Sequence, residues 1–541
     1  MIELLAKLRA LAGIDDERIA REREVATERE LTTGPSVHPA AVRHMRELAA
    51  RPGTIRLGSA TLDAEVPMVV EVPRDKYAGH VLCTGATGSG KTTVLASACR
   101  QLMRAYARSP TAPTIAIVDH KGDLANAAQD IAAELATSMP RAQAQAFLGQ
   151  FAVIDPFASD ALVPFQVLAG EPDTEPAVLA YEVTSLLGRL AGDPFGSRQE
   201  AFTFLTLLDG RLTGRSLVAI DALFADPSRL LAVMRRSPST DVRQGFASGL
   251  PLGVDGIAGV RARLQRLLRL RSSRLSLGAS STASLRECLA ARVLVIDLGS
   301  HVPLGCEDIG RFWSGFFTLK LVRAIFSRSR AEARRPAFVF IDEWQEGLES
   351  AGGIAADYAR VLQMARSKSV SLVLSSQSLA SASAVSAALP RHVATNTAVQ
   401  LRFRASEEDA LAMRRLLPVT GRRLRTHDER RHDRRGPDFL SPEEERSLLA
   451  AEAATLPDRT FYYWDQRQRG SALLANADRV DITARANAPA WIQRAVKRGC
   501  LAQSVEELEE QLATTVRQGH FAAAPQPPTE PPAPRRRTRR R

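Results

Sequence analysis

The stretch Gly85-Ala86-Thr87-Gly88-Ser89-Gly90-Lys91-Thr92 decides the fold of this chain. The largely apolar run 80–83 precedes it, and residues 93–98, which have helical character, follow it. Strand, glycine-rich loop and helix form the context in which the pattern G-x-x-x-x-G-K-[ST] makes a phosphate-binding loop. Its glycines permit positive φ angles, which turn backbone N–H groups inward toward an anion. The positive end of the following helix faces the same anion.

This loop predicts a site for a nucleoside triphosphate, ATP, together with Mg²⁺. Residues 85–90 and Thr93 would surround the phosphates, and Lys91 would reach the β- and γ-phosphates. The hydroxyl of Thr92 would coordinate the metal ion. The alternative is a Gly/Thr-rich turn that matches the pattern by chance, and the flanking strand and helix argue against it.

The composition is that of a soluble globular protein. A length of 541 residues allows about three domain-sized units. No run approaches 18 consecutive apolar residues, so we expect no transmembrane helix, and the start of the chain lacks the apolar core and the small-residue cleavage site of a signal peptide. The five cysteines contain no C-x-x-C pair, which predicts a reducing, cytoplasmic setting and no disulfide or metal framework.

The positive charge of the chain is concentrated in two arginine-rich segments. Of a net charge of +12, the C-terminal run 535–541 carries six and the segment 421–436 carries four, which leaves a nearly neutral remainder. Concentrated arginines favour polyphosphate partners such as nucleic acid. A solubilising tail and a charged loop are the alternative interpretation of these segments.

Six short apolar runs predict a sheet that is buried on both faces, as in parallel α/β folds. They are 114–119, 151–155, 293–297, 338–342, 371–375 and 398–403. Four of the six end in Asp, which places carboxylates at the carboxyl edge of the sheet, where α/β proteins bind ligands. Two further runs, 54–57 and 68–72, are predicted as strands that lead into this sheet.

Changes in composition predict the divisions of the chain. They are a helical arm (1–53), the first part of the nucleotide domain (54–171), an inserted all-α subdomain (172–291), the second part of the nucleotide domain (292–483), C-terminal helices (484–523) and a disordered Pro/Arg tail (524–541).

Hydrolysis requires more than a phosphate loop, and the pair Asp342-Glu343 after an apolar run supplies candidates. Asp342 is placed to orient Mg²⁺, and Glu343 to orient or deprotonate the attacking water. Gln377, just beyond another apolar run, can sense the γ-phosphate or position water. Arg366 is a candidate arginine finger for the site of a neighbouring subunit. A capping acid pair and a surface arginine are the plain alternatives.

The motifs resemble the FtsK/HerA superfamily of DNA-pumping ATPases, and most of all the TraD/TraG-type coupling proteins of conjugation and type IV secretion. The resemblance is carried by residues 80–92, by Asp119-His120-Lys121-Gly122-Asp123 and by the segment 365–378. It implies a RecA-like motor domain with a mainly parallel sheet, an inserted all-α subdomain and helical extensions at both ends. It also implies the arginine-finger position for Arg366 and the sensor position for Gln377.

Two departures from such proteins stand out. Coupling proteins usually carry N-terminal membrane helices, which this sequence lacks, so membrane recruitment would require a partner. Relatives often have an arginine just before the first motor strand, where this chain has Gly79 and His80. Any role of that arginine would fall to another residue, such as Arg74 or Lys76.

The sequence therefore predicts an ATP-hydrolysing DNA translocase that works as a ring, with a hexamer expected, and that contacts DNA largely without sequence preference. Its partners would be DNA, further copies of the chain, and secretion or relaxosome proteins. A HerA-like helicase or a repair or defence motor uses the same residues and stays open. A nucleotide-gated recruitment module with slow turnover also stays open, although the Asp342-Glu343 pair argues against it.

Overall fold

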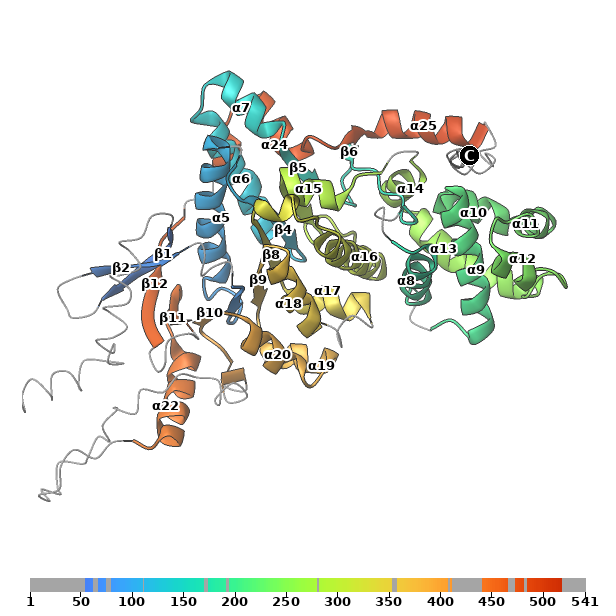
Figure 1. The fold of residues 1–541 in the computed structure, drawn as a ribbon. Helices are drawn as coiled ribbons and strands as arrows, with labels where there is room; N and C mark the ends of the chain where they lie inside the picture. Colours follow the sequence, from blue (N-terminus) through green and yellow to red (C-terminus); the bar gives the residue numbers. More distant parts are fainter. Residues whose placement is uncertain are drawn as a thin grey trace, which may run out of the picture.

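The computed structural model places a large sheet with helices on both faces beside a lobe made only of helices (Figure 1). The described residues are 54–61, 67–73, 79–109, 111–169, 174–190, 194–279, 282–352, 358–406, 409–410, 440–465, 472–480 and 484–517. The predicted N-terminal arm, the segment 421–436 and the tail 524–541 lie outside them, as do Arg74 and Lys76.

Seven parallel strands form the centre of the sheet, in the order β10-β3-β9-β8-β4-β7-β5. They are β3 (Val81–Thr84), β4 (Thr114–Asp119), β5 (Phe151–Ile154), β7 (Val293–Asp297), β8 (Ala337–Asp342), β9 (Val370–Ser376) and β10 (Val399–Phe403). Every side chain in these strands except Ile341 is buried, because helices cover both faces of the sheet. The α/β fold with a mainly parallel sheet is therefore confirmed.

Four antiparallel strands extend the sheet beyond β10, in the order β11, β12, β1 and β2. They are β11 (Thr460–Asp465), β12 (Ala472–Ala477), β1 (Thr54–Thr61) and β2 (Pro67–Pro73). The lead-in strands predicted from the sequence are thus β1 and β2, at the edge of the sheet. Strands β11 and β12 were not predicted, and they place a C-terminal segment directly beside the parallel strands.

Alternate residues of the parallel strands pack into two separate hydrophobic cores, one on each face of the sheet. Val81, Ile115 and Phe340 face the core beneath α5 (Lys91–Arg108), α6 (Asp123–Thr137), α7 (Arg141–Leu148) and α24 (Ala490–Arg498). Leu82 and Val339 face the other core, which includes α16 (Glu307–Phe326), α17 (Trp344–Ala351), α18 (Tyr358–Ser367) and α20 (Leu389–Asn396). This period of two fixes the register of the strands, since a slip of one residue would exchange the two faces.

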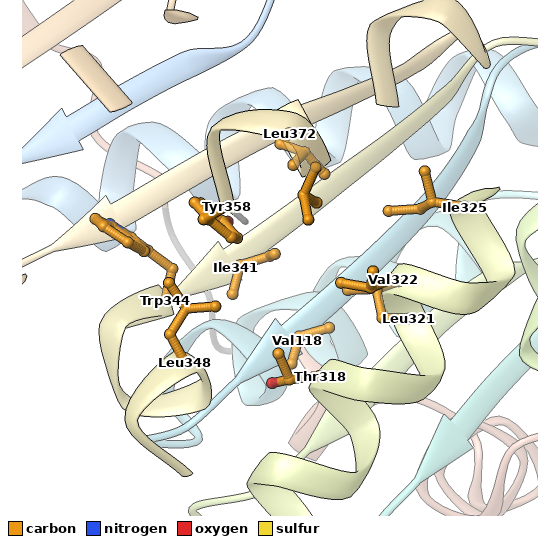
Figure 2. Close-up of a pocket in the computed structure, with 11 residues that line it drawn as sticks. Val118, Thr318, Leu321, Val322, Ile325, Ile341, Trp344, Leu348, Tyr358 and Leu372 are labelled. Carbon is orange, nitrogen blue, oxygen red and sulfur yellow. The ribbon is translucent and has the colours of Figure 1, made fainter. Parts of the chain in front are cut away.

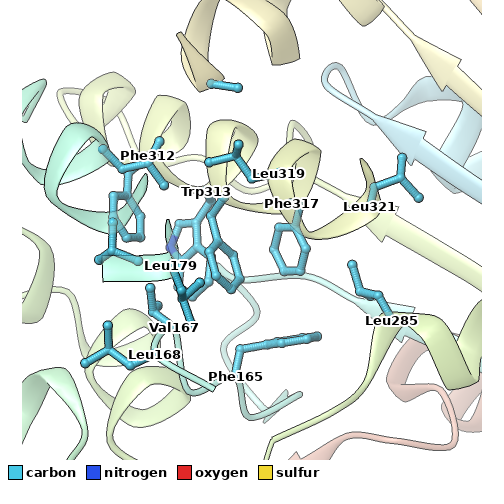
Figure 3. Packing of buried hydrophobic residues seen from close by; sticks show 14 of the residues in the cluster. Phe165, Val167, Leu168, Leu179, Leu285, Phe312, Trp313, Phe317, Leu319 and Leu321 are labelled. Carbon is cyan, nitrogen blue, oxygen red and sulfur yellow. The ribbon is translucent and has the colours of Figure 1, made fainter. Parts of the chain in front are cut away.

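The helical lobe follows β6 (Ala161–Leu162) in the chain and precedes β7. Its helices are α8 (Pro176–Gly188), α9 (Ser197–Thr213), α10 (Leu217–Phe224), α11 (Pro227–Met234), α12 (Thr240–Gly245), α13 (Val254–Leu268), α14 (Arg271–Gly278) and α15 (Leu285–Ala291). An aromatic cluster on α16 joins the lobe to the sheet: Trp313 and Phe317 pack near Phe165 (Figure 3), and Trp313 Nε1 donates to Ser273 Oγ at 3.1 Å.

Three further parts of the C-terminal half complete the fold. The last helix, α25 (Val505–Arg517), crosses from the sheet domain to the lobe (Figure 1), and β13 (Gln503–Ser504) pairs with β6. Helix α19 (Leu379–Val385) lies between β9 and β10 in the chain, and α22 (Pro442–Thr455) lies between β10 and β11. Helix α23 (Ala484–Asn487) follows β12. Among the described residues, no helix is both long and apolar enough to cross a membrane.

Candidate nucleotide site

The phosphate loop runs from the end of β3 to the start of α5, which begins at Lys91. Gly85, Gly88 and Gly90 have φ angles of 155°, 75° and 106°, which lie in the region that glycine adopts most readily. Space also requires two of these glycines. A Cβ on Gly85 would lie 2.5 Å from Cβ of Phe403, and one on Gly90 would lie 2.8 Å from Cα of Arg459.

Backbone hydrogen bonds fix the loop against three neighbouring strands. Gly85 N donates to Ser376 O at 3.2 Å, and Ala86 N donates to the carbonyl oxygen of Arg404 at 2.6 Å. On the far side of the loop, Ser89 O accepts from Arg459 N at 2.7 Å. The ends of β9 and β10 and the start of β11 therefore hold the loop in a fixed shape.

The side chain of Lys91 is buried inside the loop. Its Nζ donates to the carbonyl oxygens of Gly85 at 2.6 Å and Ala86 at 3.2 Å. A buried ammonium group beside the N-terminus of an 18-residue helix makes a strongly positive site for an anion. Thr92 and Thr93 lie in the first turn of α5 and are partly exposed.

Asp342 ends β8, two strands from β3, and is buried. Burial raises the pKa of its carboxyl group, and the charge of Glu343 raises it further, whereas Lys91 and Lys121 lower it. The buried Asp342 carboxylate and the Thr92 hydroxyl, in the first turn of α5, are hard oxygen donors of the kind that Mg²⁺ prefers. The residues that the sequence assigned to the metal thus fit such an ion.

Glu343 adopts a left-handed backbone conformation, with φ 49° and ψ 50°, at the N-cap of α17. Such a conformation costs a residue other than glycine about 1–2 kcal/mol. The side chain is only 2% exposed, and its carboxylate accepts from Lys121 Nζ at 2.7 Å and Gln345 Nε2 at 2.7 Å. The carboxylate of this residue is therefore both buried and carried by a strained turn, and strained backbone of this kind clusters at functional sites.

Gln377 connects the phosphate loop to Glu343. Its Oε1 accepts from Thr87 Oγ1 at 2.9 Å, and its backbone N donates to Glu343 Oε2 at 3.2 Å. The structure therefore brings together the loop, Asp342, Glu343 and Gln377, which come from three segments of the sequence.

Sequence reasoning gave no role to Lys121 or Asp119, although both lie in the motif that carried the resemblance. Asp119 pairs with Asp342 across β4 and β8, and its carboxylate accepts from the backbone N–H groups of Lys121 and Ala125, both at 2.9 Å. Burial, followed by the charge of Asp342, raises the pKa of Asp119 to about 6. Asp119 thus shapes the turn that aims Lys121 at Glu343, and the Asp-x-x-Gly-Asp pattern was the signal for this turn.

Arg366 does not join the other residues within one chain. It is exposed in the last turn of α18, just before the amino end of β9, whereas the phosphate loop lies at the carboxyl end of that strand. Seven residues of strand separate the two ends by about 20 Å. Arg366 is therefore too far from the phosphate loop of its own chain to contact a nucleotide there.

His80, which directly precedes β3, is buried and contacts two neighbouring elements. Its Nδ1 accepts from Leu372 N at 2.9 Å, so its Nε2 carries the proton and donates to Leu362 O at 2.7 Å. Burial lowers the pKa of the imidazole, and the charge of Arg366 lowers it further. A neutral His80 thus ties the start of β3 to β9 and to the helix that carries Arg366.

Two other features of the described residues are not part of this site. A cavity of about 20 Å³ between the sheet and α16–α18 is lined mainly by apolar side chains such as Val322 and Leu372 (Figure 2), and it lies apart from the phosphate loop. Asp155, Asp297 and His301 lie together beyond β5 and β7, with possible ligand atoms within 4.8 Å of one another, and His301 Nδ1 pairs with Asp155 Oδ2 at 2.6 Å.

Comparison with known proteins agrees with this architecture. No protein-family model matches the sequence, and no curated protein sequence matches it either. Solved structures do match: the plasmid coupling protein TrwB with ADP and Mg²⁺ superposes with a TM-score of 0.51 at 16% identity, over 77% of this chain and 89% of that chain. The chain has the fold of the TrwB coupling protein.

A second TrwB structure, with the non-hydrolysable ATP analogue ADPNP, gives a TM-score of 0.51 at 15% identity, over 82% of this chain and 93% of that chain. VirB4 of Thermoanaerobacter pseudethanolicus matches at a TM-score of 0.45 and 11% identity, over 80% of this chain and 97% of that chain. The resemblance to coupling proteins is thus confirmed at the level of the fold, through TrwB.

Proposed function

We propose that this chain is an ATP-hydrolysing DNA translocase, which moves DNA during conjugative transfer or secretion. The observation that carries the proposal is the continuous contact from Thr87 through Gln377 to Glu343, because it joins the phosphate loop to the candidate base. A protein that merely bound a nucleotide would have little need of this link.

Each residue of the site has a distinct role in this proposal. Lys91 and the loop N–H groups bind the phosphates of ATP, and Thr92 and Asp342 would hold Mg²⁺, which would supply charge neutralisation at the phosphates. Glu343 orients the attacking water and accepts its proton. Gln377 reports the γ-phosphate, because it contacts Thr87 of the loop and the Glu343 carboxylate at the same time. The TrwB structures with ADP and Mg²⁺ and with ADPNP support these ligands.

The position of Arg366 supports the proposal of a ring. An exposed arginine at the amino edge of the sheet, remote from the loop of its own chain, is available to the carboxyl-edge site of a neighbouring copy. In other nucleotide hydrolases, an arginine finger supplied in this way raises kcat by a factor of about 10³–10⁵. We propose a hexamer with DNA in its centre, recruited to its cellular site by secretion or relaxosome partners.

One observation favours a second candidate, a nucleotide-gated recruitment module with slow turnover. The Glu343 carboxylate is buried and accepts hydrogen bonds from Lys121, Gln345 and the backbone of Gln377, which compete with an attacking water in this conformation. In a motor, nucleotide or DNA binding would release this carboxylate. In a recruitment module, the carboxylate would stay engaged.

ATPase activity with and without DNA, on particles whose subunit number is measured in the same preparation, separates these functions. The translocase predicts turnover that DNA stimulates and that coincides with a ring. Slow turnover that DNA leaves unchanged would support the recruitment module. A preparation that binds no ATP would refute both.

A further inference from the structure

The turn before β11 lies directly against the phosphate loop, although more than 360 residues separate the two in the sequence. We propose that Arg459, in this turn, binds the phosphates of the nucleotide in the site of its own chain. This inference rests on the proposed function, since it assumes that the loop binds a nucleotide. It adds a residue that neither the motifs nor the roles assigned above include.

The backbone of Arg459 is held at the loop by two hydrogen bonds. Its N–H donates to Ser89 O at 2.7 Å, and its carbonyl oxygen accepts from Ala477 N, on β12, at 2.8 Å. Its N and Cα lie 3.1 Å and 2.8 Å from the place that a Cβ on Gly90 would occupy. Arg459 is therefore in contact with the residue that directly precedes Lys91.

The side chain of Arg459 starts along the same surface. Its Cγ lies 3.0 Å from the Cβ position of Gly90, and the residue as a whole is exposed. In the part of the chain that the structure describes, no acidic side chain pairs with Arg459, whereas nearby Arg404 is paired with Asp458 at 2.8 Å. The guanidinium group is thus available to an anion beside the loop, and its planar donor fork suits phosphate oxygens.

The backbone conformation of Arg459 indicates that the turn does not require an arginine side chain. Arg459 has a φ of 64°, in the left-handed region that favours glycine. Glycine would make both backbone hydrogen bonds without strain, so the turn gains nothing from an arginine side chain. Positions of this kind, where a side chain is kept against the backbone preference, cluster at functional sites.

The same conformation provides a clean experiment on the full-length chain. Arg459→Gly removes the cation while the backbone contacts with Ser89 and Ala477 remain possible and the strain is relieved. Arg459→Lys retains the positive charge. Arg236→Gly is the matched control, because Arg236 is an exposed arginine in a turn of the helical lobe, remote from the loop. The dissociation constant for Mg-ATP is measured by calorimetry, and the melting temperature is recorded for every variant.

We expect Arg459→Gly to raise the Kd for Mg-ATP about tenfold, as the loss of one charge-assisted contact does, without lowering the melting temperature. Arg459→Lys should recover most of the affinity, and Arg236→Gly should bind as the wild type does. An unchanged Kd in Arg459→Gly would overturn the proposal, and so would an Arg459→Lys variant as weak as the glycine variant. A wild-type chain that binds no nucleotide would instead refute the proposed function.

Discussion

Thr87 Oγ1 donates a 2.9 Å hydrogen bond to Oε1 of Gln377, and this contact joins the phosphate loop to the segment that follows β9. Gln377 in turn contacts Glu343 through its backbone. Two hydrogen bonds therefore connect the phosphate loop to the candidate base.

The Thr87–Gln377 contact is tested by two substitutions of similar size. Thr87→Val removes the hydroxyl group and keeps the shape, and it should reduce turnover roughly fivefold, as expected for the loss of one neutral hydrogen bond. Thr87→Ser keeps the hydroxyl group and should stay near the wild-type rate. Steady-state kcat measurements check both variants. If the valine variant turns over like the serine variant, this contact has no part in catalysis.

Glu343→Gln tests the candidate base. This variant should still bind ATP, because Lys91 and the loop are intact, but its turnover should fall by about 10² to 10⁴, the usual contribution of a positioned base. Lys91→Ala serves as the comparison, since it should lose nucleotide-dependent activity altogether. Hydrolysis by the glutamine variant at the wild-type rate would show that the assignment of Glu343 is wrong.

The lowered pKa of the buried His80 predicts that the free energy of unfolding depends on pH. Its pKa in the folded chain is lowered by burial, so below about pH 6.5 the unfolded chain takes up a proton that the folded chain does not. The free energy of unfolding should therefore fall as pH decreases from 6.5 toward the lowered pKa, by up to about 1.4 kcal/mol per pH unit from this residue.

Urea denaturation at pH 7.5 and pH 5.5 measures this effect. His80→Gln preserves a donor and an acceptor without a titrating group, so the loss of stability between the two pH values should be smaller than in the wild type. His392→Gln, at an exposed position, is the control and should leave the pH dependence unchanged. Equal pH dependence in all three proteins would exclude a role for His80.

We expect the arginine-rich tail to contribute to DNA affinity and not to ATP hydrolysis. Deleting residues 524–541 removes six positive charges from a segment remote in sequence from every residue of the nucleotide site, so basal ATPase activity should be retained. DNA affinity should fall, and its dependence on salt should flatten, because fewer counterions are released. A salt titration of DNA binding checks this, and identical curves would mean that the tail serves another purpose.

Local sequence patterns were sufficient to predict the parallel strands and the phosphate loop. Burial on both faces produces continuous apolar runs such as 114–119, and the loop requires glycine at fixed positions, so both leave a local trace. The strand-end pair Asp342-Glu343 was visible for the same reason. The assignment of these side chains to catalysis and metal binding stays a prediction.

The contacts around Glu343 and the loop could not be predicted in this way. The ion pair of Lys121 with Glu343 joins residues 222 positions apart, and the contact of Arg459 with Ser89 depends on β11 lying beside β10. Such contacts arise from strand order, which no local period encodes. The left-handed conformation of Glu343 was equally hidden, because glycine or asparagine, and not glutamate, normally signals it.

The central claim is that the site is shared between subunits, and mixing two inactive variants tests it most directly. Arg366→Ala should fold and bind ATP, but its turnover should fall by a factor of about 10³ or more. Lys91→Ala should lose its own nucleotide site and still present Arg366 to the site of a neighbouring subunit. With subunit exchange demonstrated, the mixture should regain activity, because some interfaces pair an intact Lys91 with an intact Arg366. A mixture that stays as inactive as each variant alone would contradict the shared site and the ring built on it.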